Sequence, residues 1–111
     1  MPLRTRPSLP LLLLPALAVM AGCDPGSTAE EHLAQAKAHR EAGERQAAVL
    51  ELKNALQQNP GLAEARWVLG QAHLAEENGP AALKEISRAR ELGLTGPEVT
   101  LALARALILS G

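Results

Sequence analysis

Histidine and serine side chains are the first candidates for chemistry in this sequence. His32 and His39 are seven residues apart, which exceeds the i, i+4 spacing of a paired zinc site on one helix. His39 and His73 are 34 residues apart, a spacing that other positions share and that favours a packing role over metal ligation. No serine lies in a nucleophile-elbow sequence, and the sequence has no glycine-rich phosphate loop. We therefore expect no enzyme activity, no metal and no cofactor.

The single cysteine, Cys23, has a more specific context. It follows a basic start, an apolar run over residues 9–19 and two small residues, which is the order found in exported precursors. The apolar run is shorter than the roughly 20 residues needed to span a bilayer. It also contains Pro10 and Pro15, which disfavour a permanent transmembrane helix. The sequence predicts a signal peptide over residues 1–22 that is cleaved before Cys23.

The four residues Met20–Cys23 (Met-Ala-Gly-Cys) resemble the lipobox of bacterial lipoproteins, which usually begins with Leu. The resemblance implies that the Cys23 thiol carries diacylglycerol and that the chain is anchored to the bacterial cell envelope, facing the periplasm. Several acyl chains anchor a protein stably where a single chain is marginal. Asp24 implies retention at the inner membrane in enteric bacteria, but this rule does not extend to other groups. Residues 23–28 would then form the lipidated end and a short polar tether.

Composition favours an all-α domain and argues against nucleic-acid binding. The chain has 111 residues with one Trp, no Tyr and no Phe, whereas the helix formers Ala and Leu are abundant. The formal net charge is −1, and loss of Arg4 and Arg6 with the signal peptide makes the remainder more acidic. A weakly acidic chain without aromatic stacking platforms is poorly suited to nucleic acid. Nothing in the sequence implies a small-molecule substrate.

Residues 29–111 repeat with a period of 34. Five pairs of positions match at this offset: Ala36 with Gly70, His39 with His73, Ala48 with Ala82, Leu52 with Ile86, and Ala55 with Ala89. The spacing is that of the tetratricopeptide repeat (TPR), a helix–turn–helix unit. We expect an all-α solenoid with repeats over 29–62 and 63–96 and a partial repeat over 97–111. The small residues Ala36 and Gly70 would face Ala48 and Ala82 where paired helices approach most closely.

Turn and capping residues divide this region into expected helices at 29–42, 45–58, 63–76, 79–92 and 97–110. Ser27 or Thr28 can cap the first helix. Gly43 is expected to supply the turn of the first repeat. The second repeat has Glu77 at that position, and we expect Gly79 to supply the turn there instead.

The last expected helix is apolar nearly all round, with Arg105 as its only charged residue after Glu98. A terminal helix of a solenoid should have a polar outer face. The helix therefore looks like the first helix of a third repeat without its partner. The chain would be a truncated form of a longer array, which we favour, or would cover this face by self-association.

The first helices of stacked repeats are expected to line a concave groove. The groove positions mix apolar and polar side chains, and are Leu33, Lys37, Arg40, Trp67, Gln71, Leu74, Leu101 and Arg105. This mixture suits an amphipathic or extended peptide segment. Trp67 is either an anchor for the partner or a core residue between repeats. The predicted activity is therefore binding of other envelope proteins.

Residues 48–60 and 88–94, together with the lipobox start, resemble a more specific group. They are similar to the N-terminal part of the large TPR lipoproteins of PEP-CTERM/exosortase systems, which accompany exopolysaccharide production. The resemblance implies a membrane-anchored scaffold in envelope export or exopolysaccharide biosynthesis. The alternative is a truncated fragment of a longer TPR protein with no independent activity.

Overall fold

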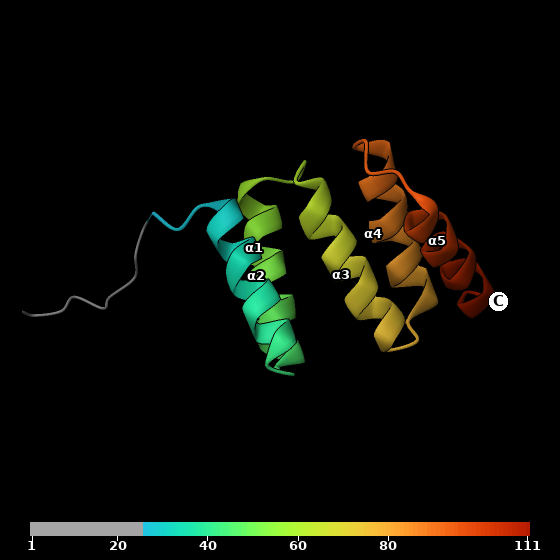
Figure 1. Ribbon diagram of the computed structural model, residues 1–111, viewed down its shortest axis with the longest axis horizontal. Helices are drawn as coiled ribbons and strands as arrows, with labels where there is room; N and C mark the ends of the chain where they lie inside the picture. Colours follow the sequence, from blue (N-terminus) through green and yellow to red (C-terminus); the bar gives the residue numbers. More distant parts are fainter. Residues whose placement is uncertain (1–25) are drawn as a thin grey trace, which may run out of the picture.

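The structure, a computed structural model, describes residues 26–111. The predicted signal peptide and Cys23 lie outside this range. The described residues form five helices and no strand, which confirms the all-α prediction (Figure 1). The helices are α1 Ala29–Glu41, α2 Arg45–Gln58, α3 Ala63–Ala75, α4 Gly79–Glu91 and α5 Pro97–Leu109. Each begins at the residue expected and ends at the expected residue or one before it. None of these helices is long and apolar enough to cross a membrane.

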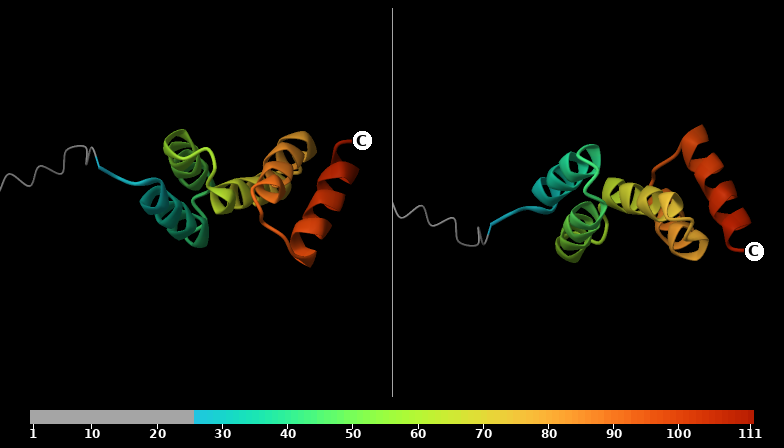
Figure 2. Two further views of the ribbon diagram at one scale, coloured as in Figure 1. Left: turned by 90° about the horizontal axis from the view of Figure 1, so that it is seen from above. Right: turned by 90° about the horizontal axis from the view of Figure 1, so that it is seen from below.

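The helices stack as successive helical hairpins. α1 packs on α2, α3 packs on α4, and α5 packs on α4. Seen along the helices, α1 and α5 lie on one side, α2 and α4 lie on the other, and α3 lies between them (Figure 2). The first helices α1 and α5 therefore lie on one face of the molecule and the second helices α2 and α4 lie on the opposite face, while α3 contributes side chains to both (Figure 2).

The core follows the same 34-residue period as the sequence. Its buried residues form two clusters, one around α1 to α3 and one around α3 to α5, and the half-buried Trp67 packs against both. An added Cβ at Gly70 would lie 2.4 Å from Cγ1 of Ile86. The close approach expected at Gly70 is therefore present, but the facing residue is Ile86, about one turn along α4 from the expected Ala82.

The turns of the two repeats differ from each other. Gly43 has a φ of 78° and makes the first turn, as predicted. In the second turn Glu77 itself adopts the left-handed conformation, with a φ of 58°, so the prediction that Gly79 supplies this turn is wrong. Gly79 instead begins α4, and a Cβ there would lie 2.5 Å from the carbonyl carbon of Leu109. Glycine is required at this position because it lets the end of α5 approach α4.

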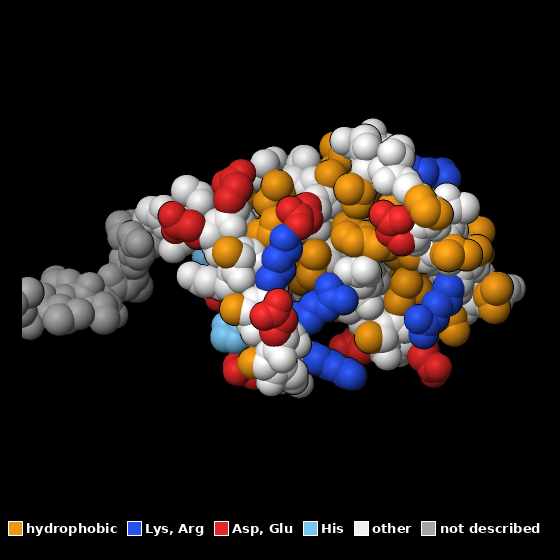
Figure 3. All heavy atoms as spheres, viewed as in Figure 1, with side chains coloured by type: hydrophobic (Ala, Val, Ile, Leu, Met, Phe, Trp, Pro, Cys, Tyr) orange, Lys and Arg blue, Asp and Glu red, His pale blue; other side chains and the backbone are white. Residues whose placement is uncertain are grey.

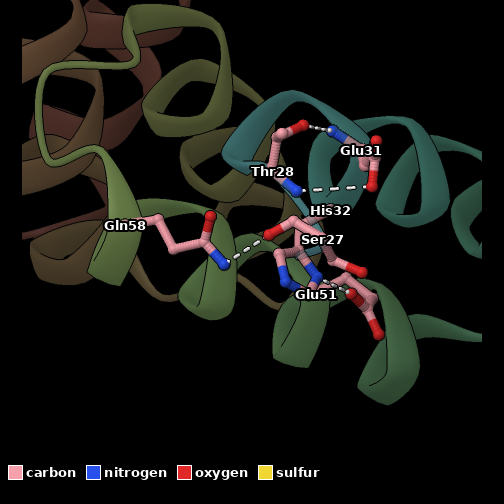
Figure 4. Close-up of polar contacts among 6 residues, drawn as sticks. All are labelled: Ser27, Thr28, Glu31, His32, Glu51 and Gln58. Carbon is pink, nitrogen blue, oxygen red and sulfur yellow. Dashed lines mark hydrogen bonds and ion pairs between the residues drawn. The ribbon is translucent and has the colours of Figure 1, made fainter. Parts of the chain in front are cut away.

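Polar contacts fix the start of α1 against α2 (Figure 4). The hydroxyl of Thr28 accepts a hydrogen bond of 3.1 Å from the Glu31 amide, and the Glu31 carboxylate accepts one of 3.3 Å from the Thr28 amide. This reciprocal capping box shows that Thr28, rather than Ser27, caps the helix. The side-chain amide of Gln58 donates a 2.7 Å hydrogen bond to the Ser27 carbonyl, so α2 also holds the segment that leads into α1.

Each repeat has one side-chain hydrogen bond between its two helices, and the two bonds occupy equivalent positions. In the first repeat, Nδ1 of His32 lies 2.6 Å from Oε2 of Glu51 (Figure 4). At the equivalent positions of the second repeat, 34 residues later in the sequence, Nη1 of Arg66 in α3 lies 2.9 Å from Oε2 of Glu85 in α4. These contacts were absent from the sequence-based expectations, because they depend on how the two helices of a hairpin are aligned.

One side of α5 is buried and the other is apolar and exposed. The buried side packs into the second core cluster through Val99, Ala102, Leu103 and Ala106. On the other side, Leu101, Leu107 and Ile108 are 70%, 57% and 79% exposed. The apolar outer face expected for the last helix is therefore present.

Candidate peptide-binding groove

A pocket of about 380 Å³ opens on the face formed by α1, α3 and α5. It is lined by six of the eight side chains that the sequence placed in a groove: Arg40, Trp67, Gln71, Leu74, Leu101 and Arg105. Hydrophobic and basic side chains lie next to one another on this face (Figure 3). The volume is within the range of roughly 300–1,000 Å³ that is usual for ligand pockets.

The two remaining groove residues lie elsewhere. Leu33 belongs to the first core cluster and is not among the side chains that line the pocket. Lys37 lines a neighbouring hollow with Arg40 and forms an ion pair with Glu64. The difference arises because α1 turns Leu33 toward α2 and α3, where it is covered.

The gap between α1 and α3 and the gap between α3 and α5 differ in their side-chain contacts. Lys37 pairs with Glu64 across the gap between α1 and α3. The same repeat positions in α3 and α5 hold Gln71 and Glu98, and both of these side chains line the pocket. Gln71 is a neutral amide, and no ion pair joins α3 to α5 within residues 26–111. The second gap, between α3 and α5, therefore holds a pocket that no ion pair crosses.

The pocket combines an aromatic ring, an exposed aliphatic side chain and charged groups. Trp67 packs between the two core clusters, which is one of the roles considered for it, and it also lines the pocket. Leu101 offers apolar surface beside it, and Arg40 and Arg105 supply guanidinium groups. Arg40 also donates a 2.9 Å hydrogen bond to the side-chain oxygen of Gln71. Aromatic and arginine side chains are enriched at protein interfaces, and such a surface can bind an apolar anchor and a carboxylate together.

The histidines that share a repeat position differ in their surroundings. His39 lies at the surface, with its Nδ1 3.0 Å from Oε2 of Glu44. His73 is half-buried, and its own Nδ1 is buried without a hydrogen-bond partner. Within the part of the chain that the structure describes, no group of three or more His, Cys, Asp or Glu residues could hold a metal ion.

Sequence reasoning missed a second pocket, of about 460 Å³, on the opposite side of α3. Lys53 of α2 and Lys84 of α4 both line it. They are not at equivalent repeat positions, and only the packing of α2 and α4 on α3 brings them to one groove. The repeat pattern therefore carried no signal for this site.

The stacked helical hairpins define a helical-repeat protein. Comparison with known families matches residues 39–106 to a tetratricopeptide repeat family. The match covers more than half of the sequence, and the chain belongs to this family. Tetratricopeptide repeat domains generally mediate interactions between proteins and are typically non-enzymatic. Comparison with curated proteins finds no match to the chain.

Proposed function

We propose that this protein is a membrane-anchored scaffold that binds a peptide segment of a partner protein in the pocket between α3 and α5. The observation that carries the proposal is the open second gap, where Trp67, Leu101 and Arg105 line one pocket. An apolar side chain of the partner would pack on Trp67 and Leu101. Acidic groups of the same segment would pair with Arg105 and Arg40.

The anchor in this proposal is lipid on Cys23. Its support is the lipobox-like sequence Met20–Cys23, which follows a basic and then apolar start. Lipid at this position would leave the repeats close to the membrane, since α1 begins at Ala29. The resemblance to exosortase-associated TPR lipoproteins supports envelope export or exopolysaccharide biosynthesis as the setting.

Intact-mass measurement of protein purified from bacterial membranes tests the anchor. We expect a mass that shows loss of residues 1–22 and gain of acyl chains, and no such gain in Cys23→Ser. Full-length, unacylated protein in the cytosol would contradict the anchor and leave the groove as a separate question.

Co-purification from detergent-solubilised membranes tests the groove. Leu101→Asp places a charge on the pocket wall at a residue that is 70% exposed, so the fold should tolerate it. Gln46→Asp is the matched control, because it adds the same charge at an exposed position outside the groove. We expect the partner to be lost from Leu101→Asp and retained by Gln46→Asp. Equal recovery with both variants would rule out this pocket as the binding site.

A further inference from the structure

The second groove lies on the other face of the repeats, between α2 and α4. It has a volume of about 460 Å³, and α2, α3 and α4 each contribute side chains to it. α3 separates the two grooves. Leu69 and His73 line this one, whereas Trp67 and Gln71 line the pocket beside α5. The helical period of 3.6 residues places these two pairs on different sides of α3.

Two lysines give the second groove its charge. Lys53 and Lys84 are exposed, and neither forms an ion pair with any residue of 26–111. The other charged residues of the groove are Arg66 and Glu85, which neutralise each other at 2.9 Å. Nε and Nη2 of Arg66 also donate to the Pro60 carbonyl. The uncompensated charge of the groove is therefore that of the two ammonium groups.

His73 and the first turn of α4 contribute further polar groups beside this groove. His73 lines the groove, and its buried Nδ1 has no hydrogen-bond partner among the described residues. Ala81, in the first turn of α4, lines the same groove. Its position brings the positive end of the α4 dipole toward a bound anion.

The groove also has apolar surface beside its charges. Leu69 is buried, Leu56 is half-buried, and both line the groove. A free inorganic anion would leave this surface unused, whereas a peptide can place an apolar side chain on it. The guanidinium of Arg66 is already engaged by Glu85 and Pro60, so no free guanidinium fork faces the groove for bidentate phosphate binding.

We propose that the groove between α2 and α4 binds an acidic peptide segment of a partner protein. A carboxylate would lie between Lys53 and Lys84, and a neighbouring aliphatic or aromatic side chain would pack on Leu56 and Leu69. This site goes beyond the function proposed above. It uses the opposite face of α3 and requires neither the lipid anchor nor the pocket beside α5.

Fluorescence anisotropy of a labelled peptide tests the proposal. The full chain in non-ionic detergent is titrated with an acetylated peptide of alternating glutamate and leucine. We expect the double variant Lys53→Gln/Lys84→Gln to weaken binding about tenfold, the effect of losing two charge-assisted contacts. The control Arg45→Gln/Arg90→Gln removes the same charge from exposed positions of α2 and α4 that line neither groove, and should change affinity less than about twofold. Far-UV circular dichroism should be the same for all variants.

Three further measurements determine the chemistry of the ligand. A peptide with glutamine in place of glutamate should bind the wild-type chain weakly. Its affinity should be no higher than that of the glutamate peptide for Lys53→Gln/Lys84→Gln. Inorganic phosphate, and phosphatidylglycerol in the same micelles, should not displace the glutamate peptide. Four results would each overturn the proposal. They are no binding of the glutamate peptide, equal affinity for the glutamine and glutamate peptides, a larger loss of affinity from the control substitutions than from Lys53→Gln/Lys84→Gln, and displacement of the peptide by phosphatidylglycerol.

Discussion

The two complete repeats make an equivalent contact between their two helices, although one of the two partners differs. The first repeat joins its helices through His32 and Glu51, and the second joins them through Arg66 and Glu85. The partners are 19 residues apart in both cases. The comparison shows that the contact between the two helices is kept even where the residue that pairs with glutamate changes from histidine to arginine.

Between successive repeats, by contrast, a contact present in the first gap is absent from the second. An ion pair of Lys37 with Glu64 bridges α1 and α3. Gln71 and Glu98 stand at the equivalent positions of α3 and α5 and line an open pocket instead. Contacts within a repeat therefore stabilise the hairpin, whereas a change between repeats leaves room for a partner.

Gly79→Ala should have the largest effect on stability. The first repeat has the long side chain of Arg45 at this position, but a Cβ at Gly79 would lie 2.5 Å and 2.6 Å from backbone atoms of Leu109 and Ser110. Backbone cannot move aside as a side chain can, so we expect a loss of about 2–3 kcal/mol in the free energy of unfolding. Urea denaturation followed by circular dichroism measures it. Arg45→Ala is the control, and an equal loss there would show that the contact with α5 is unimportant.

Gly70→Ala should have the next largest effect. A methyl group in a helix normally stabilises it, but here the new Cβ would lie 2.4 Å from Cγ1 of Ile86. We expect a loss of about 1–2 kcal/mol, because a side chain rather than the backbone must yield. The first repeat holds Ala36 and Leu52 at these positions, and both are fully buried. Adding Ile86→Leu to Gly70→Ala should therefore restore most of the lost stability, and no recovery would contradict the equivalence of the two sites.

Glu77→Gly should stabilise the protein. Glu77 has a φ of 58°, a conformation that is strained for a side-chain-bearing residue and that Gly43 adopts in the first repeat. Relief of this strain should add about 0.5–1 kcal/mol to the free energy of unfolding. Glu76→Gly is the matched control, because Glu76 has a φ of −88° and should gain nothing. Thermal unfolding of both variants gives the comparison, and a lower melting temperature for Glu77→Gly would contradict it.

His32→Arg should have the smallest effect. It gives the first repeat the arginine that already pairs with Glu85 in the second. A guanidinium is always charged and binds carboxylates in a fixed geometry, so we expect a gain of about 0.5 kcal/mol at neutral pH. Repeating the denaturation in His32→Arg/Glu51→Gln should remove the gain. A gain that persists there would show that it does not come from this pair.

Local sequence signals were sufficient to predict the helices and to place several of the side chains that line the pocket beside α5 on one face. Trp67, Gln71 and Leu74 lie at i, i+4 and i+7 of one helix, so the helical period alone places them on one face. The role of Gly79 and the burial of Leu33 could not be predicted in this way. Both depend on the distance and alignment between helices, which the repeat period leaves undetermined. The groove with Lys53 and Lys84 is a product of the same tertiary packing.

Photo-crosslinking in membranes tests most directly whether the open gap beside α5 is the binding site. A photoreactive amino acid is placed at position 101, and its crosslinking yield is compared between the wild-type background and Gln71→Lys. The new lysine would lie opposite Glu98 and could form the ion pair that Lys37 forms with Glu64 in the other gap. If the account is correct, position 101 crosslinks a partner protein, and Gln71→Lys closes the gap and sharply reduces the yield. Lys37→Gln, which removes the ion pair that bridges the other gap, should leave the yield unchanged. An unchanged yield in Gln71→Lys, or no crosslink from position 101 in either background, would contradict it.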